Sequence, residues 1–326
     1  MRLNKNTLYV LQNLLVGCRS SSDVSDKIEG VDVRSIQRAL ERLTDAGLIT
    51  RTGPSNNPTY SIDYLNLLSA TIPEKILEDE QRPESSFNHE LFEWLLKTSA
   101  ADLEQSPVGF ELESRDKKIS AKELEFLTVE LSWKSSALEG NTYTLLDTQI
   151  LLTEGVKAKG KTEFETQMVL NHKNAVAFIV SNPELFSRDI QFATVEELHR
   201  IIGDNLGIPS GVRKRLVKIS ASNYTPLANP QQLRERADDA IQIINSCSDP
   251  YMKSLMALCL IPYLQTFEDG NKRTGRMLAN AILISTIGRG FSLRKVSAKE
   301  LALAYLAFYE FNSMKSLSKI LKTELS

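Results

Sequence analysis

The stretch QTFEDGNKRTGRML, residues 265–278, decides what fold and site this chain builds. Two carboxylates come first, a Gly-Asn pair follows, and an apolar run with helical spacing comes last. Three cations stand just after the Gly-Asn pair: Lys272, Arg273 and Arg276. This order of residues predicts a loop and then a helix that begins near Asn271.

The start of that helix is a predicted anion site. The first N–H groups of a helix have no partners within it, and the macrodipole is positive there. Gly270 lets an anion approach the backbone because glycine has no Cβ, and Arg273 and Arg276 lie on one face. Cations are unfavourable at a helix start unless an anion offsets them, so we expect a polyphosphate cradle. Asp269 is placed to hold a Mg²⁺ on the phosphates. The alternative is a charged loop before a buried helix, with no ligand.

Beyond this stretch, the chain from about residue 121 onward has the apolar spacing of helices. The helical segments are 119–140, 161–180, 194–206, 232–247, 251–264, 273–288 and 297–311. Only residues 213–226 depart from the pattern, because a β-branched stretch and a Ser-Asn turn predict a short hairpin there. The expected fold of this part is mostly α, with one β-hairpin.

Residues 1–62 predict a separate N-terminal module of helices and a hairpin. The predicted elements are helices over 4–17 and from Ser21 or Ser22 to about Gly30, a third helix between Asp32 and Gly47, and strands over 48–52 and 59–62. Caps at Asp32 and Gly47 support the third helix. This order resembles a winged helix-turn-helix, a module of many bacterial regulators.

The third helix of the N-terminal module has a polar face suited to the major groove of DNA. The residues that could reach base edges are Arg34, Gln37, Arg38 and Arg42. Residues 1–62 hold eight Lys and Arg against six Asp and Glu, a mild basic bias of +2. Winged helices also serve as protein-interaction modules, so DNA and protein partners both stay open.

Composition limits the number of domains, the compartment and the kinds of partner that we expect. The chain has 326 residues, 42% hydrophobic and 25% charged, which is typical of a soluble protein with two or three domains. The longest apolar run, about residues 255–264, is too short to span a bilayer, so we expect no membrane partner. Three cysteines far apart indicate reduced thiols and a cytoplasmic location, and scattered histidines argue against a zinc site. Residues 63–120 are predicted to be a helical, acidic linker, partly exposed, before a main domain over 121–326.

Three motifs resemble those of the Fic family. TFEDGNKRTGR resembles its His-x-Phe-x-(Asp/Glu)-Gly-Asn-(Gly/Lys)-Arg-x-x-Arg signature, with matches from Phe267 to Arg276. SSALEGN, residues 135–141, resembles its inhibitory motif Ser/Thr-x-x-x-Glu-(Gly/Asn), on an expected inhibitory helix over 131–141. The predicted hairpin resembles the family's flap, which pins a target segment by strand addition. The resemblance covers about residues 70–320.

The resemblance implies an enzyme that transfers AMP from ATP to a Ser, Thr or Tyr hydroxyl of a target protein. It implies the following site residues: Asp269 for Mg²⁺; Gly270, Asn271 and Lys272 for an anion hole; Arg273 and Arg276 for the outer phosphates; Ser135, Glu139 and Gly140 for inhibition; and Val217, Lys218, Ile219 and Tyr224 for the flap. Glu139 would pair with Arg276 at rest and hold ATP in an unproductive pose. Tyr224 is also a candidate contact for adenine, and family members often form homodimers.

Two positions depart from the family pattern. Gln265 stands where the family has the histidine that takes the proton from the target hydroxyl. An amide can orient a hydroxyl but is no base near pH 7, and loss of a general base costs about 10²–10⁴-fold in rate. Lys272 stands where many members have glycine, and one branch with lysine there transfers phosphate. The resemblance therefore implies an autoinhibited adenylyltransferase that is inactive or very weakly active. The alternative is a nucleotide-binding pseudoenzyme or regulator that binds DNA through its winged helix.

Overall fold

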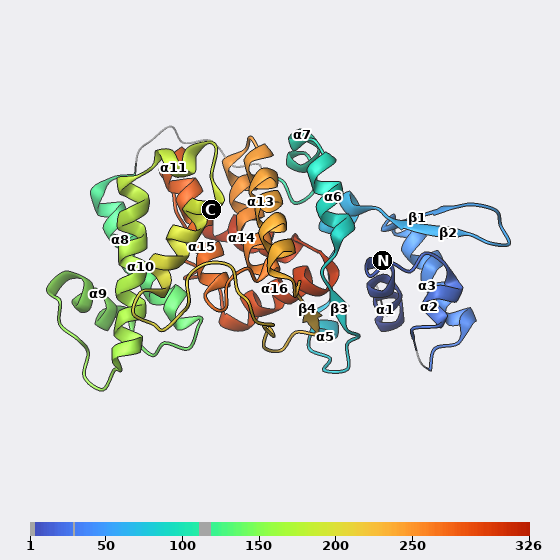
Figure 1. Ribbon diagram of the computed structural model, residues 1–326, viewed down its shortest axis with the longest axis horizontal. Helices are drawn as coiled ribbons and strands as arrows, with labels where there is room; N and C mark the ends of the chain where they lie inside the picture. The colour runs from blue at the N-terminus through green and yellow to red at the C-terminus, as the bar shows by residue number, and fades with distance from the viewer. Residues whose placement is uncertain (1–3, 29, 111–118) are drawn as a thin grey trace.

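The computed structural model describes residues 4–28, 30–110 and 119–326. Helices dominate the described chain and only short strands accompany them, so the predicted mostly helical fold is confirmed. Figure 1 shows an elongated molecule, with the N-terminal helices and their hairpin at one end. Among the described residues, no helix has the length and apolar character needed to cross a membrane.

The N-terminal elements follow the predicted order. They are α1 (Lys5–Leu15), α2 (Ser21–Ser25), α3 (Val33–Asp45) and the antiparallel pair β1 (Ile49–Thr52) and β2 (Thr59–Ile62). Asp32 caps α3 as predicted, accepting from the N–H of Ser35 at 3.0 Å. Helix α2 is shorter than predicted, and Ser20 caps it because Ser20 and Asp23 form a reciprocal capping box. The assignment to the winged-helix class stays a prediction, and residues 1–3 and 29 of this module lie outside the described residues.

The described part of residues 63–120 is helical and partly exposed, as predicted, but it packs its apolar side chains into the core and does not run free as a linker. The segment holds α4 (Tyr64–Leu68), α5 (Glu74–Leu77), β3 (Ser85–Ser86), α6 (His89–Lys97) and α7 (Ala100–Glu104). Its apolar side chains, such as Leu67, Phe87 and Phe92, are buried in the main core. Residues 111–118 of the range lie outside the described residues. This segment is therefore part of the body.

A buried ion pair fixes that segment to the C-terminal part of the chain. Arg82 donates to the carboxylate of Glu310 on α16 (Ala298–Phe311), with an Nε–Oε2 distance of 2.6 Å. Its Nη1 donates to the carbonyl oxygens of Leu77 and Asp79, and its Nη2 to that of Ala221 at 2.8 Å. Charge pairing and hydrogen bonding at every nitrogen explain why a cation is tolerated in the core.

The prediction of a hairpin over 213–226 is wrong, whereas the role of Val217, Lys218 and Ile219 as flap residues stays a prediction. The segment has one short strand, β4 (Tyr224–Thr225), and it pairs in parallel with β3. Glu310 holds the neighbouring turn, accepting from the Ser222 hydroxyl at 2.9 Å and from the Asn223 N–H at 3.0 Å. The β-branched pattern therefore marks an extended segment whose partners come from distant parts of the chain.

The middle of the molecule is helical. Its helices are α8 (Ala121–Ala137), α9 (Leu145–Glu154), α10 (Glu163–Ser181), α11 (Glu184–Ser187), α12 (Phe192–Gly203), α13 (Pro230–Ser246), α14 (Pro250–Leu264), α15 (Asn271–Ile287) and α17 (Lys315–Leu325). Helices α14 and α15 are almost wholly buried and pack closely. A Cβ at Gly275 would lie 2.8 Å from Cδ of Pro262, so glycine permits this approach. Helices α14 and α15 together fix the loop between them, residues 265–270.

Candidate nucleotide site at the start of helix α15

The loop between α14 and α15 has two left-handed residues that set its shape. Gln265 ends α14 with a φ of 50°, and Gly270 precedes α15 with a φ of 78°. The amide of Asn271 braces the loop, accepting from the Phe267 N–H at 2.9 Å and donating to the Phe267 carbonyl at 2.8 Å. The Asn271 side chain, which the sequence placed in an anion hole, is thus occupied with the loop backbone.

Helix α15 begins at Asn271, as predicted, and its first turn opens on the loop. The first helical hydrogen bond runs from the Thr274 N–H to the Gly270 carbonyl at 2.8 Å. The N–H groups of residues 271–273 precede this bond and carry the positive end of the helix dipole. A Cβ at Gly270 would contact the His199 ring at 3.5 Å, so the loop lies directly against that ring.

Arg273 is a buried cation with unused donor capacity. Its side chain is 3% exposed, and Nη2 pairs with the Asp269 carboxylate at 2.9 Å. Its Nη1 is buried and has no hydrogen-bond partner among the described residues. Burial lowers the pKa of Arg273, and the Asp269 carboxylate opposes that shift. A buried guanidinium nitrogen without a partner is costly, and a bound anion would satisfy it.

Arg276 is engaged by the end of α8. Its Nε donates to the Ser135 hydroxyl at 3.0 Å, and its Nη2 donates to the Glu139 carboxylate at 2.8 Å. The predicted Glu139–Arg276 ion pair is therefore confirmed, and Lys272 lies 3.5 Å from the other carboxylate oxygen. Burial raises the pKa of Glu139, but Arg276 and Lys272 outweigh it, so the net shift is downward. Helix α8 ends at Ala137, so Glu139 lies just beyond the helix and not within a helix over 131–141; Gly140 follows with a φ of 90°.

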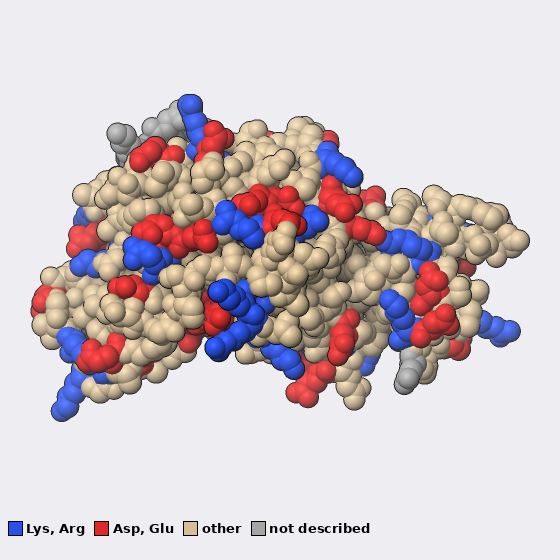
Figure 2. Space-filling view, in the orientation of Figure 1, with Lys and Arg blue, Asp and Glu red and all other residues tan. Residues whose placement is uncertain are grey.

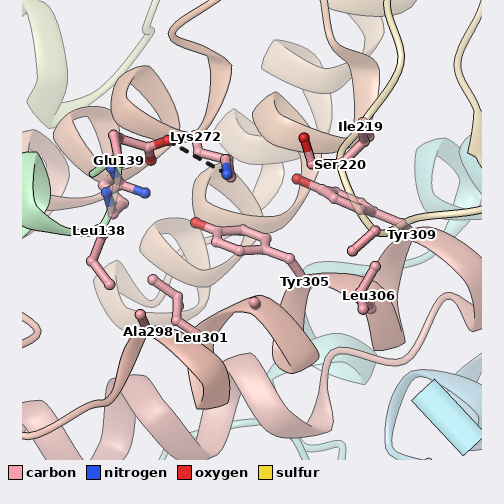
Figure 3. Close-up of a pocket in the computed structure, with 13 residues that line it drawn as sticks. Leu138, Glu139, Ile219, Ser220, Lys272, Ala298, Leu301, Tyr305, Leu306 and Tyr309 are labelled. Atoms are coloured by element: carbon pink, nitrogen blue, oxygen red, sulfur yellow. Dashed lines mark hydrogen bonds and ion pairs between the residues drawn. The ribbon is translucent and has the colours of Figure 1, made fainter. Parts of the chain in front are cut away.

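Two cavities meet at this ion pair. One of about 220 Å³ is lined by Glu139, Gln265, Lys272 and Arg273, and by the flap residues Val217, Lys218 and Ile219. The second, of about 90 Å³, lies beside it and is more apolar (Figure 3). Glu139 and Lys272 belong to both linings and bridge the two cavities. The sequence pattern pointed to the first cavity and missed the second.

Gln265 is held by its surroundings. Its Nε2 donates to the Pro262 carbonyl at 2.6 Å, and its Oε1 accepts from Asn271 at 3.2 Å. Buried Arg213 donates from Nε to the Gln265 carbonyl at 2.6 Å and also binds the Leu227 carbonyl. Arg213 thus joins the flap segment to this loop, a role that the sequence gave no signal for.

His199 reaches the loop from α12, although it is distant in the sequence. Its ring stacks on Phe267 at 3.8 Å, and its Nε2 lies 3.0 Å from the Asp269 carbonyl. A carbonyl can only accept, so Nε2 carries the proton. Burial lowers the pKa of His199. Because Nε2 is committed to the backbone and Nδ1 is buried away from the cavity surface, His199 supports the loop and does not take the place of the histidine expected at position 265.

A magnesium ion fits this site only together with phosphate ligands. The Asp269 carboxylate is 67% exposed and faces Arg273. Within residues 4–28, 30–110 and 119–326, no three His, Cys, Asp or Glu side chains gather as a metal cluster. Mg²⁺ commonly takes one or two carboxylates and completes its shell with water and substrate phosphates. One exposed carboxylate beside an anion site matches that pattern.

The remaining predicted residues lie away from this site. Tyr224 is 3% exposed, its hydroxyl donates to the Tyr263 carbonyl at 3.0 Å, and its ring stacks on Tyr263. The prediction that Tyr224 contacts a target or adenine is therefore wrong, because the residue belongs to the core. The four residues proposed for DNA are on α3, at the N-terminal end of the molecule in Figure 1.

The geometry is that of a helical protein in which buried cations gather at a helix start. Residues 189–283 match the model of the Fic/DOC family, and the chain carries a Fic/DOC family domain there. Among similar proteins, fic-1 of Caenorhabditis elegans, named a protein adenylyltransferase, is 29% identical over 155 residues, or 45% of this chain and 30% of that protein. Protein adenylyltransferase Fic of Nematostella vectensis is 29% identical over 157 residues, or 47% and 36%.

A solved structure agrees in fold. Residues 134–508 of Fic-1 from C. elegans superpose with a TM-score of 0.52 at 21% identity, covering 72% of this chain and 69% of that one. The chain spans about a third of the length of the curated relatives it matches. The family domain matched by residues 189–283 contains the loop and the start of α15.

Proposed function

We propose that this chain is a protein adenylyltransferase of the Fic type that Glu139 holds at rest. One observation carries the proposal: the Glu139 carboxylate lies between Arg276 and Lys272, beside a helix start where a buried nitrogen of Arg273 has no partner within the described part of the chain. The Glu139 carboxylate would thus already occupy part of the proposed anion site. The substrate would be ATP, and the target a protein hydroxyl.

The cations divide the work of binding a triphosphate. Arg273 and the N–H groups at the start of α15 would hold the phosphates nearest the loop. Arg276 would bind the outer phosphates after Glu139 leaves. Asp269 would hold Mg²⁺, which neutralises charge that develops on the phosphates. Val217–Ile219 of the flap line the same cavity and would position a target segment.

The smaller cavity suits a purine base. Its walls are apolar, with Leu301 and Leu306 of α16, and it holds the rings of Tyr305 and Tyr309 (Figure 3). The Tyr309 hydroxyl is buried without a hydrogen-bond partner among the described residues, and the buried Tyr305 hydroxyl lies near the Arg276 guanidinium. An aromatic wall with an unused polar group is typical of sites for flat heterocycles.

Position 265 sets the rate. Gln265 faces the phosphate cavity, but its amide cannot take a proton from a target hydroxyl near pH 7. We therefore expect the natural chain to bind ATP better than it transfers AMP. Restoring a histidine should raise transfer by about 10²–10⁴-fold.

The test compares four proteins: the natural chain, Glu139→Gly, Gln265→His and the double variant. Each is incubated with a lysate and, in separate reactions, with Mg-ATP labelled on the α-phosphate or on the γ-phosphate, and label on protein is measured in both. We expect the strongest labelling from the double variant and little from the others. Label on the γ-phosphate alone would indicate phosphate transfer, and no label from the double variant would overturn the proposal.

A second candidate is a nucleotide-dependent regulator that binds DNA through residues 4–62. Three arginines favour it: Arg34, Arg38 and Arg42 are exposed on α3 at intervals of four, and their side chains form no ion pair or hydrogen bond within the described chain. The rest of the surface is mixed, since Figure 2 shows both charges interspersed over the visible face. Replacing one arginine with alanine should reduce the slope of log affinity against log salt by about 1. DNA binding unchanged by all three replacements would exclude this candidate.

A further inference from the structure

His172 lies buried beneath the ion pair that closes the nucleotide site. It is on α10 and is fully buried. Its Nε2 lies 2.9 Å from the Ser135 hydroxyl, and its Nδ1 lies 2.8 Å from the Met168 carbonyl. A longer contact of 3.3 Å joins Nδ1 to the Ser136 hydroxyl. The proposed transfer reaction gives this imidazole no task.

The contacts fix which nitrogen carries the proton. The Met168 carbonyl can only accept, so Nδ1 is the donor and Nε2 of the neutral ring is an acceptor. The imidazole stays neutral because burial, with the charges of Arg273 and Arg276 nearby, lowers the pKa of His172 to about 3. The Ser135 hydroxyl must then give its proton to His172.

This orientation matters for Arg276. With its proton on the His172 side, the Ser135 oxygen presents lone pairs to Nε of Arg276 at 3.0 Å. The Ser135 carbonyl accepts from Nη2 of the same arginine at 3.1 Å. Two oxygens of one residue therefore dock the end of α8 on Arg276, four residues before Glu139. A serine free to rotate would point its proton at the guanidinium for part of the time.

We propose that His172 is a positioning residue of the inhibitory contact: it holds the Ser135 hydroxyl as an acceptor for Arg276 and so keeps Glu139 on the nucleotide site. The inference rests on the proposed function and adds a third member to the Ser135 and Glu139 pair. Helices α8, α10 and α15 are joined by this chain of hydrogen bonds, which passes from Met168 through His172 and Ser135 to Arg276.

The test is a cycle of variants in which Mg-ATP affinity is measured by calorimetry. His172→Ala should bind Mg-ATP about threefold to tenfold more tightly than the natural chain, because it loosens one buried hydrogen bond of the closed state. In the Glu139→Gly background the same change should leave affinity unaltered. His172→Gln, whose amide oxygen can accept from Ser135, should restore much of the natural affinity.

Asn171 provides the matched control. It is adjacent on α10, is also fully buried and donates to the carbonyls of Ile202 and Asp204, away from Arg276. Asn171→Ala should leave Mg-ATP affinity unchanged in both backgrounds, although it lowers stability. Equal affinity shifts for His172→Ala with and without Glu139 would mean a general structural effect and would overturn the inference.

A nucleotide-free measurement separates the two proposals. In protein labelled with ¹⁵N-histidine, the NMR chemical shifts of the His172 ring nitrogens should show a proton on Nδ1 and no titration near pH 6. In the Ser135→Ala variant, the chemical shift of Nε2 should change. A proton on Nε2 would overturn the inference even if ATP binds. The expected shifts, together with no ATP binding by Glu139→Gly, would instead overturn the proposed function and with it the inhibitory purpose of this contact. Ser135→Ala also tests the affinity prediction if His172→Ala fails to fold, and it should then bind Mg-ATP more tightly.

Discussion

Two buried arginines in this molecule each pair with a glutamate, and the two pairs differ in what surrounds them. Arg82 and Glu310 have side chains 4% and 0% exposed, and neighbouring backbone groups use their remaining hydrogen-bonding capacity. Arg276 is equally buried, at 1%, but its partner Glu139 is 19% exposed and faces the cavities. The Arg82–Glu310 pair is shielded from solvent on all sides, whereas the Arg276–Glu139 pair is open to the cavities on one side.

The difference separates a structural role from an exchangeable one. Nothing in solution can reach Glu310, so the first pair breaks only when the body unfolds. Under the proposed function, a phosphate would reach Arg276 from the cavity, and the second pair would exchange one anion for another without unfolding. We therefore expect the open ion pair to compete with a ligand for Arg276, and the closed ion pair to contribute to stability alone.

The largest effect is expected from the closed pair. Arg82→Met should lower the free energy of unfolding by about 3–5 kcal/mol, because it leaves the Glu310 carboxylate buried without a counter-charge. Urea denaturation followed by circular dichroism measures this change. Replacing both partners with apolar residues should recover part of the loss. A loss below about 1 kcal/mol for Arg82→Met would show that the pair is not closed.

A smaller effect on stability, and a clear one on binding, is expected from the open pair. Glu139→Gln should tighten Mg-ATP binding by about tenfold or more, because hydrogen bonds to charged groups are worth about 1.5–3 kcal/mol and the competitor is weakened. Calorimetric titration gives the affinity. Unchanged affinity, with Arg82→Met destabilised as above, would mean that the open pair does not compete with ATP.

The open pair should also respond to pH. The folded pKa of Glu139 lies below its usual value of 4.5. Its contribution to stability is therefore complete above pH 4.5 and is lost as pH falls through the lowered folded pKa. The difference in unfolding free energy between the natural chain and Glu139→Gln should shrink over that window in urea titrations at a series of pH values. A difference that is constant with pH would contradict the downward shift.

The smallest effect is expected from an exposed pair, Lys5 and Asp79, which are 44% and 23% exposed at 2.6 Å. Lys5→Ala should give no resolvable change in Tm, because solvent screens the charges and the side chains lose freedom on pairing. Differential scanning calorimetry provides the measurement. A clear drop in Tm would mean that α1 depends on this contact for docking.

The same contrast explains what the sequence could and could not predict. The start of α15 and the cations around it lie within one short stretch, so local rules for helix ends located them. The Glu139–Arg276 pair came from the resemblance of two motifs, since no local rule joins residues 137 positions apart. The helices of the body followed from apolar spacing.

The features that the sequence did not predict depend on contacts between residues that are far apart in the chain. Arg82 is a polar residue in a Glu-, Pro- and Ser-rich segment, and only its pairing with Glu310, 228 positions away, makes it a core residue. The strand predicted at Tyr224 is present as β4, but it pairs with β3 and not with a neighbouring strand of a hairpin. His172 and His199 seemed scattered in the sequence, and the packing of α10 and α12 on α15 brings both to the site.

The backbone at residue 265 has a genetic consequence. Arg213 donates to the main-chain carbonyl there, where φ is 50°, and this contact does not involve the Gln265 side chain. Histidine is among the few residues enriched in that conformation. Glutamine and histidine codons differ in a single third base. Under the proposed function, one point mutation would therefore supply the missing base, while Glu139 would still hold the site at rest.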